Sequence, residues 1–146
     1  MEEIDRQIIR LLGHDGRMSF TDLGKATGLS TSAVHQRVRR LEQRGVIRGY
    51  AAVVNAEALG LALTAFVSVT PLDPSTAEET PSRLSGMPEI EECHSVAGEE
   101  SYLLKVRSAT PRALEELLAR IRAEASVSTR TTIVLSTSYE SRPLPA

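Results

Sequence analysis

The chain has 146 residues, of which 41% are hydrophobic and 25% are charged, and its formal net charge is −2. This composition is typical of a globular protein with one average domain or two small ones, and no apolar run reaches the roughly 20 residues of a membrane helix. The single cysteine, Cys93, excludes an internal disulfide and a metal site built from cysteines alone. The acidic first residues lack the basic and apolar regions of a secretory signal, so we expect a cytoplasmic protein.

The charge is distributed unevenly along the chain. Residues 1–60 carry a net charge of +2, whereas residues 61–146 carry −4. Within the first part, residues 17–48 hold seven Lys and Arg side chains against two carboxylates, a net charge of +5. A basic segment in an acidic protein indicates either a surface for a polyanion such as nucleic acid or an ordinary solvated helix face.

Three short helices are predicted before residue 46. The first carries an apolar stripe at Ile4, Ile8, Leu11 and Leu12, and turn residues at 14–16 end it.

The second predicted helix is capped by Ser19 or Thr21, with Leu23 and Ala26 facing inward. A tight turn follows at Gly28, because glycine readily takes a positive φ.

The third predicted helix is capped by Ser30 or Thr31 and buries Val34, Val38 and Leu41, which are spaced i, i+4 and i+7. Gly45 is the expected glycine at its end. Residues 46–54 are then predicted to form a short β-hairpin or a strand that leads away.

The spacing of the second and third helices is that of a helix-turn-helix, and the basic residues concentrate there. The buried stripe leaves polar residues on the outer face, where a recognition helix reads DNA bases with its N-terminal part. Ser32, His35 and Gln36 suit base edges, whereas the later arginines suit phosphates. The predicted DNA-binding residues are Ser30, Thr31, Ser32, His35, Gln36, Arg39, Arg40, Arg44 and Arg48.

The second half of the chain changes to the period of β-strands. Leu63, Ala65, Val67 and Val69 alternate with polar residues and Phe66, which predicts a strand that ends before Pro74. Residues 75–78 resemble a capping box that starts a helix, and Pro81 is expected to shorten or kink that helix.

Two further strands, a helix and a last strand complete the predicted order. The strands cover 90–96 and 102–106 with a turn at 98–101, and Thr110–Pro111 starts a helix with a buried stripe. The last strand is predicted at 131–135. The stripe comprises Leu114, Leu117, Leu118 and Ile121.

The order βαββαβ indicates a ferredoxin-like split βαβ arrangement, with an antiparallel sheet and two helices on one face. The other face, which includes Phe66, needs a cover, so we expect a dimer joined through these sheets.

The sequence resembles the Lrp/AsnC family of transcription regulators over nearly its whole length. The first-helix segment 4–12, the turn 15–17 and the glycine-leucine-serine turn 28–30 sit at family spacing. In the second half, 93–98 followed by 102–106 is similar to the family's effector domain. Further matches are Leu23–Gly24, Arg37–Val38, Leu41–Glu42 and Gly45–Ile47.

This resemblance implies an α+β protein with a winged helix-turn-helix at 1–50, a linker strand or hinge at 51–61, a ferredoxin-like βαββαβ effector domain at 62–140 and a flexible tail at 141–146. It implies a regulator that binds inverted-repeat double-stranded DNA, forms homodimers that assemble into octamers or other higher oligomers, and responds to an amino acid or a related small molecule. The implied effector-binding residues are Ala97, Gly98, Glu99, Glu100, Ser101, Ser128, Thr129 and Thr131.

The sequence departs from the family pattern at two places. Ser101 stands where the family usually has an Asp, so either Glu99 or Glu100 replaces that carboxylate or the ligand differs. Pro81 lies in the first helix of the effector domain, where it is expected to change local contacts between subunits.

Other chemistry finds little support in the sequence. Cys93 and His94 are neighbours on a predicted strand and so point to opposite faces, which favours a buried thiol and a hydrogen-bonded histidine over a metal site. No nucleophile elbow or phosphate loop is present, so we predict no enzyme, no metal and no cofactor besides the effector. Two alternatives to an effector-controlled regulator are an architectural DNA-binding protein of low specificity and a small ferredoxin-like enzyme with a helical appendage.

Overall fold

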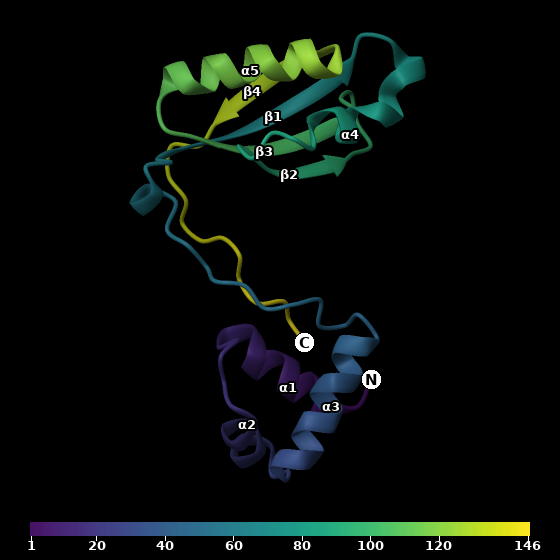
Figure 1. Ribbon diagram of the computed structural model, residues 1–146, viewed down its shortest axis with the longest axis vertical. Helices are drawn as coiled ribbons and strands as arrows, with labels where there is room; N and C mark the ends of the chain where they lie inside the picture. The colour runs from purple at the N-terminus through teal and green to yellow at the C-terminus, as the bar shows by residue number, and fades with distance from the viewer. The chain divides into compact units, whose positions relative to one another are not determined.

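Three helices form the first part of the computed structural model, which describes residues 1–146 (Figure 1). They are α1 (Glu3–His14), α2 (Phe20–Thr27) and α3 (Thr31–Gln43). Of the candidate caps, Ser19 and Ser30 are the residues used. The Ser19 hydroxyl accepts from the Asp22 N–H at 3.0 Å, and the Ser30 hydroxyl accepts from the Ala33 N–H at 3.2 Å. These bonds satisfy backbone donors that have no partner inside the helix.

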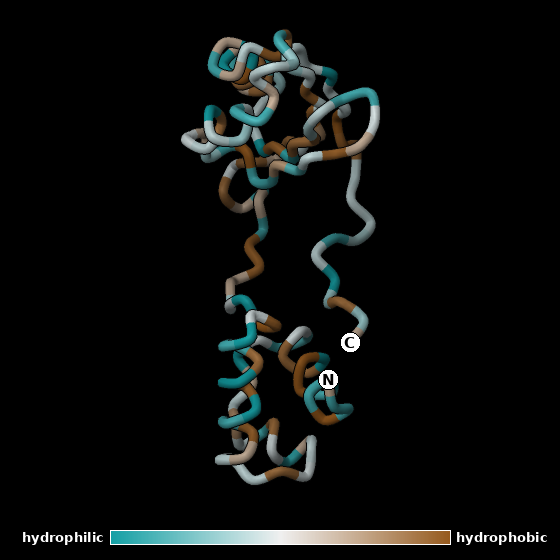
Figure 2. The backbone as a smooth tube through the Cα atoms, turned by 90° about the vertical axis from the view of Figure 1, so that its right-hand side faces the viewer, coloured by the Kyte–Doolittle hydropathy of each residue, from teal (hydrophilic) through white to brown (hydrophobic).

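The core of the three helices is small and apolar. It consists of the fully buried side chains Ile8, Leu23, Val34, Val38 and Leu41. Each was predicted from helical spacing, so this part of the prediction is confirmed. Figure 2 shows the hydrophilic residues of α3 gathered along one side of the helix, as an amphipathic surface helix requires.

The turn between α2 and α3 depends on two glycines. Gly28 takes a φ of 74°, as expected for the residue that ends α2. Gly24 is buried, and a Cβ added there would lie 2.6 Å from the Leu29 carbonyl oxygen. The expectation that Ala26 faces inward was wrong, because Ala26 is exposed. The inward side of α2 is formed by Leu23 and by Gly24, which lies against the backbone at Leu29.

No strand or hairpin forms over residues 46–54, so that prediction was wrong and the wing is absent. The N–H groups of Val46 and Ile47 instead donate to the Leu41 carbonyl oxygen, at 2.9 and 3.2 Å, and close the end of α3. Gly45, at a φ of 69°, permits this turn. The apolar residues Val53 and Val54 remain exposed, with no strand of this chain to pair with.

The second part of the chain forms one antiparallel sheet of order β2-β3-β1-β4. This confirms the predicted βαββαβ arrangement. Its elements are η1 (Glu57–Leu59), β1 (Leu63–Pro71), η2 (Pro74–Glu79), α4 (Thr80–Leu84), β2 (Ile90–Ser95), β3 (Tyr102–Ser108), α5 (Pro111–Ala125) and β4 (Val127–Ile133).

Both helices cover the same face of the sheet. Leu84 and Leu117 pack there in one cluster with Ala65, Val67 and Val69 of β1. Phe66, from the opposite face, is 37% exposed. Alternate residues of β1 therefore lie on the buried and on the open face of the sheet, as the sequence pattern predicts.

Two element starts differ clearly from the prediction, whereas the ends of β2, β3 and β4 differ by one or two residues. The helix after β1 is capped by Asp73, whose carboxylate accepts from the Ser75 N–H at 2.9 Å, so the capping box at 75–78 was wrong. Pro81 stands at the start of α4, which has only five residues, and the expected shortening is confirmed. Strand β4 begins at Val127, four residues earlier than predicted. Ser126, at a φ of 52°, reverses the chain directly after α5 and lets Val127 enter the core.

The chain divides into two compact units, Met1–Val53 with Ser138–Ala146 and Val54–Thr137. The last residues form no helix or strand, but they contact α1 through Arg10, whose Nη1 donates to the Ala146 backbone oxygen at 2.5 Å. No helix of the protein is both long enough and apolar enough to span a membrane.

Candidate functional site

The predicted DNA-binding residues all lie on the exposed surface of α3 or of the residues that adjoin its ends. Val34, Val38 and Leu41 are buried against α1 and α2, so the polar side of α3 is turned outward. The nine residues are Ser30, Thr31, Ser32, His35, Gln36, Arg39, Arg40, Arg44 and Arg48.

The arginines of this region fall into two groups. Arg37 pairs through Nη1 with Asp5 at 2.9 Å and through Nη2 with Glu2 at 3.0 Å, so it joins α3 to α1. These hydrogen bonds, to Asp5 first and to Glu2 second, raise the pKa of Arg37. The predicted phosphate-binding arginines form no ion pair with any carboxylate of the chain, which leaves their charge on the surface. They are Arg39, Arg40, Arg44 and Arg48.

Two aromatic residues at this surface were missed by sequence reasoning. The Phe20 ring lies against the His35 imidazole, with ring centroids 5.1 Å apart. The Tyr50 hydroxyl donates to Glu42 Oε1 at 2.9 Å, and burial together with this carboxylate raises the pKa of Tyr50 to about 12. Neither residue belongs to an apolar stripe, which is the signal that identified the other helical contacts.

The loop between β2 and β3 carries five of the predicted effector-binding residues. Ala97, Gly98 and Glu99 are exposed, whereas Glu100 and Ser101 are half-buried. The Ser101 N–H donates to the Val69 carbonyl oxygen at 3.1 Å and holds the end of the loop against β1.

The other three predicted effector-binding residues lie on β4. Thr129 is paired with Val69 in the sheet, so it flanks the same residue of β1 that the loop end contacts. Ser128 Oγ donates to the Thr70 carbonyl oxygen at 3.4 Å, whereas Thr129 Oγ1 accepts from Arg122 of α5 at 3.1 Å. Neighbouring strand residues face opposite sides, so Ser128 lies on the open face and Thr129 and Thr131 lie on the helical face. The loop and the start of β4 therefore lie at the same end of the sheet, but the side chains of the predicted effector-binding residues do not all lie on the same face of it.

An ion pair connects the loop to β4. The Glu100 carboxylate contacts the Arg130 guanidinium, which sequence reasoning did not single out. Glu99 forms no ion pair and is exposed. The two carboxylates that were candidates for the missing family Asp thus have different surroundings.

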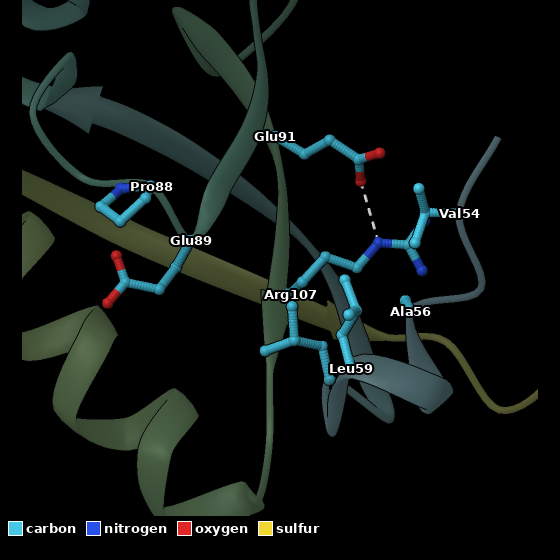
Figure 3. A pocket seen from close by; sticks show the side chains of 8 residues that line it. Val54, Ala56, Leu59, Pro88, Glu89, Glu91 and Arg107 are labelled. Carbon is cyan, nitrogen blue, oxygen red and sulfur yellow. Dashed lines mark hydrogen bonds and ion pairs between the residues drawn. The ribbon is translucent and has the colours of Figure 1, made fainter. Parts of the chain in front are cut away.

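A cavity of about 430 Å³ lies elsewhere in the second unit, beside the start of β2 (Figure 3). The charged residues that line the cavity form ion pairs. Arg107 Nε donates to Glu91 at 2.9 Å, and Glu89 pairs at 2.5 Å with Arg120, which is not part of the lining. The second oxygen of Glu89 has no hydrogen-bond partner, but it is buried beyond the reach of solvent. The apolar part of the lining comprises Val54, Ala56, Leu59, Leu61 and Pro88.

The surroundings of Cys93 and His94 differ in part from expectation. Cys93 is exposed, so the prediction of a buried thiol was wrong, because β2 is an edge strand whose end the helices leave uncovered. Partial burial still raises the pKa of the Cys93 thiol. His94 lies 3.1 Å from Glu92 through Nε2. The protein contains no group of three or more His, Cys, Asp or Glu residues placed to hold a metal ion.

Comparison with known proteins covers both units. Residues 1–42 match the AsnC-type helix-turn-helix domain, and residues 64–144 match the Lrp/AsnC ligand binding domain. The HTH-type transcriptional regulator LrpA of Mycobacterium tuberculosis is 55% identical over 142 residues, which is 97% of this chain and 95% of that protein. The leucine-responsive regulatory protein of Escherichia coli is 38% identical over 149 residues, with 99% and 90% covered.

Solved structures agree with this assignment. A feast or famine regulatory protein from M. tuberculosis, complexed with L-methionine, superposes with a TM-score of 0.96 at 54% identity and covers 99% of each chain. The predicted helix-turn-helix and ferredoxin-like domains and the predicted family are thereby confirmed, and the chain belongs to the Lrp/AsnC family of transcriptional regulators.

Proposed function

We propose that this regulator reads a specific DNA sequence with the outer face of α3 and that an amino acid bound by its second unit changes its DNA affinity. The observation that carries the proposal is the contrast among the arginines of α3. Arg37 forms ion pairs with Asp5 of α1 and with Glu2, which precedes α1. Arg39 and Arg40 have no anionic partner in the chain. Unpaired exposed guanidinium groups on the outer side of this helix can bind the phosphates of a DNA backbone.

The residues of α3 divide by chemistry into two roles. Ser32, His35 and Gln36 lie in the first two turns and offer hydrogen-bonding groups to base edges, and Gln can pair bidentately with adenine. The phosphate-binding role falls to the arginines later in the helix and after it. Ser30 caps the start of α3 and Thr31 is the first residue of the helix, where free N–H groups favour a phosphate.

An amino acid is the proposed effector. This proposal is supported by the ligand-binding domain that residues 64–144 match and by the related M. tuberculosis protein solved with L-methionine. The ammonium group of such a ligand needs an anion, for which Glu99 and Glu100 are the candidates, and its carboxylate needs N–H donors such as those of Ala97 and Gly98. Ser101, Ser128, Thr129 and Thr131 complete the proposed site.

A homodimer joined through the open faces of two sheets would cover Phe66 and present two recognition helices to a palindromic site. Octamers or other higher oligomers of such dimers would let an effector change DNA affinity by favouring one assembly over another.

The proposed boundaries are a DNA-binding domain at 1–50, a linker at 51–61, an effector domain at 62–140 and a tail at 141–146. Regulation without catalysis is supported by relatives that are named as transcriptional regulators, and a regulator of this kind would act in the cytoplasm, where its DNA lies.

The test is fluorescence anisotropy with two labelled DNA fragments, the region upstream of the protein's own gene and a scrambled version of it. Both fragments are titrated over a salt series, with and without a mixture of the twenty amino acids. We expect tighter binding to the upstream region and a shift of that affinity by the mixture. Equal binding to both fragments, steeply dependent on salt and unmoved by amino acids, would overturn the proposal in favour of an architectural protein.

A further inference from the structure

The only aromatic ring pair in the protein joins α2 to the reading face of α3. The ring of Phe20 and the imidazole of His35 have centroids 5.1 Å apart and planes tilted by 38°. This is the distance at which aromatic rings attract each other beyond simple burial of area.

The helical core does not account for the position of Phe20. Its side chain is 37% exposed and belongs neither to the buried cluster nor to the half-buried residues that pack on that cluster. The start of α2 is already secured by the Ser19 cap, and Leu23 supplies the buried contact of this helix. A large apolar ring at the surface therefore has His35 as its aromatic neighbour.

His35 is exposed between buried Val34 and exposed Gln36. An exposed side chain of this kind samples several rotamers and loses that freedom when it binds DNA. The Phe20 ring packed against the imidazole reduces this loss, because it holds the imidazole in one orientation before binding.

We propose that Phe20 is a specificity-determining positioning residue, which holds the His35 imidazole in the orientation that reads a base edge. The inference rests on the proposed reading of DNA by α3. Phe20 acts through His35, so its contribution appears in the discrimination between DNA sequences. It leaves the affinity for the scrambled DNA unchanged.

The experiment measures the ratio of dissociation constants for the scrambled and the upstream DNA. Phe20→Leu keeps an apolar side chain but removes the ring, and we expect the ratio to fall about fivefold. Phe20→Tyr keeps the ring and should restore the ratio. In a His35→Ala background, Phe20→Leu should cause no further loss, because the two residues act as one unit.

Tyr50→Leu is the matched control, since it removes an exposed aromatic residue of the same unit that contacts Glu42 and not His35. We expect it to leave the ratio unchanged. Independent losses from Phe20→Leu and His35→Ala, or an unchanged ratio in folded Phe20→Leu, would overturn the inference. A wild-type protein that does not discriminate between the two fragments would instead refute the proposed function itself.

A second measurement needs no DNA. In the proton NMR spectrum of the wild-type protein, the ring current of Phe20 should shift the imidazole protons of His35 relative to their positions in Phe20→Leu, while those of His14 stay unchanged. The His35 signals are assigned by their loss in His35→Ala. His35 signals at the same positions in the wild-type protein and in folded Phe20→Leu would overturn the inference.

Discussion

The Nη1 atom of Arg37 donates to Oδ1 of Asp5 across 2.9 Å and thereby fastens the recognition helix to α1. Asp5 is only 5% exposed, whereas Arg37 is partly open to solvent. A second hydrogen bond, from Nη2 to Glu2 at 3.0 Å, completes the bridge. Arg37, which lies within the positively charged segment 17–48, therefore connects two parts of the first unit.

Replacing Arg37 with Ala should destabilise the first unit by about 2 kcal/mol, because it leaves the carboxylate of Asp5 buried without its partner. Urea unfolding followed by circular dichroism measures the loss. Arg39→Ala, which removes the same charge from an exposed position of the same helix, is the control and should cost less than about 0.5 kcal/mol. Equal stabilities of the two variants would contradict the role of the bridge.

Gly24→Ala is expected to destabilise the protein by about 1–2 kcal/mol. A Cβ at this position would lie 2.6 Å from the Leu29 carbonyl oxygen, so the turn between α2 and α3 must shift, and that strain outweighs the gain in helix propensity. Gly16→Ala serves as the control because its nearest neighbours lie at 3.8 Å, an ordinary contact distance. Thermal melts of both variants test the difference, and a Gly24→Ala protein as stable as wild type would refute it.

The sequence predicted those parts of the fold that depend on local periodicity. Val34, Val38 and Leu41 in α3, and Ala65 and Val67 in β1, are buried as their spacing predicts. A repeat of this kind is visible in one segment, because one face of a helix or strand must avoid water.

Features that depend on distant partners could not be read in this way. The Glu100–Arg130 pair joins residues 30 positions apart, and no local pattern links them. The start of β4 depends on the reversal at Ser126, a residue type without a strong preference for positive φ. The hairpin expected at 46–54 fails because a strand needs a partner strand, which the residue pattern alone does not supply.

Gln36→Ala and Arg44→Ala should affect DNA binding differently. Loss of a bidentate base contact costs about 1–3 kcal/mol of discrimination, so Gln36→Ala should weaken binding to the upstream DNA and leave the scrambled DNA unaffected. Arg44→Ala should weaken both and reduce the slope of log K against log salt by about 1. The control is Arg112→Ala, an exposed arginine of α5 in the other unit. Identical effects of the first two variants on both fragments would refute the division of roles.

Glu89 should contribute stability in a pH-dependent way. Its hydrogen bond with Arg120, at 2.5 Å, holds the pKa of Glu89 below its ordinary value. A carboxyl group whose pKa is lowered by folding stabilises the protein above its unfolded pKa of about 4.3, and the contribution is lost as the pH falls through the folded pKa. Glu89→Gln should therefore cost about 1 kcal/mol at neutral pH and nothing once Glu89 is protonated in both states.

Urea unfolding of Glu89→Gln at pH 7 and at progressively lower pH checks this expectation. Glu116→Gln is the matched control, because its pair with Arg112 is long, at 3.5 Å, and exposed to solvent. A constant difference between Glu89→Gln and wild type down to the acid transition would show that the charge of Glu89 is not responsible.

The last prediction separates the two carboxylates of the effector loop. Glu100 is half-buried next to Arg130, whereas neighbouring Glu99 is exposed and unpaired. A carboxylate with restricted hydration binds an ammonium group more strongly than a fully hydrated one. Glu100→Gln should thus weaken L-methionine binding at least tenfold in calorimetric titrations and leave DNA binding without ligand unchanged, whereas Glu99→Gln should retain the affinity.

Arg130→Gln distinguishes direct binding from positioning. If Glu100 binds the ammonium group itself, removal of the competing guanidinium leaves ligand affinity equal or higher. If Glu100 only positions Arg130 for the ligand carboxylate, Arg130→Gln loses affinity as Glu100→Gln does. Lost affinity in Glu99→Gln, with Glu100→Gln intact, would assign the anion to Glu99. Because the exposed carboxylate would then be the one that binds, a further surface would have to close over it when the ligand is held.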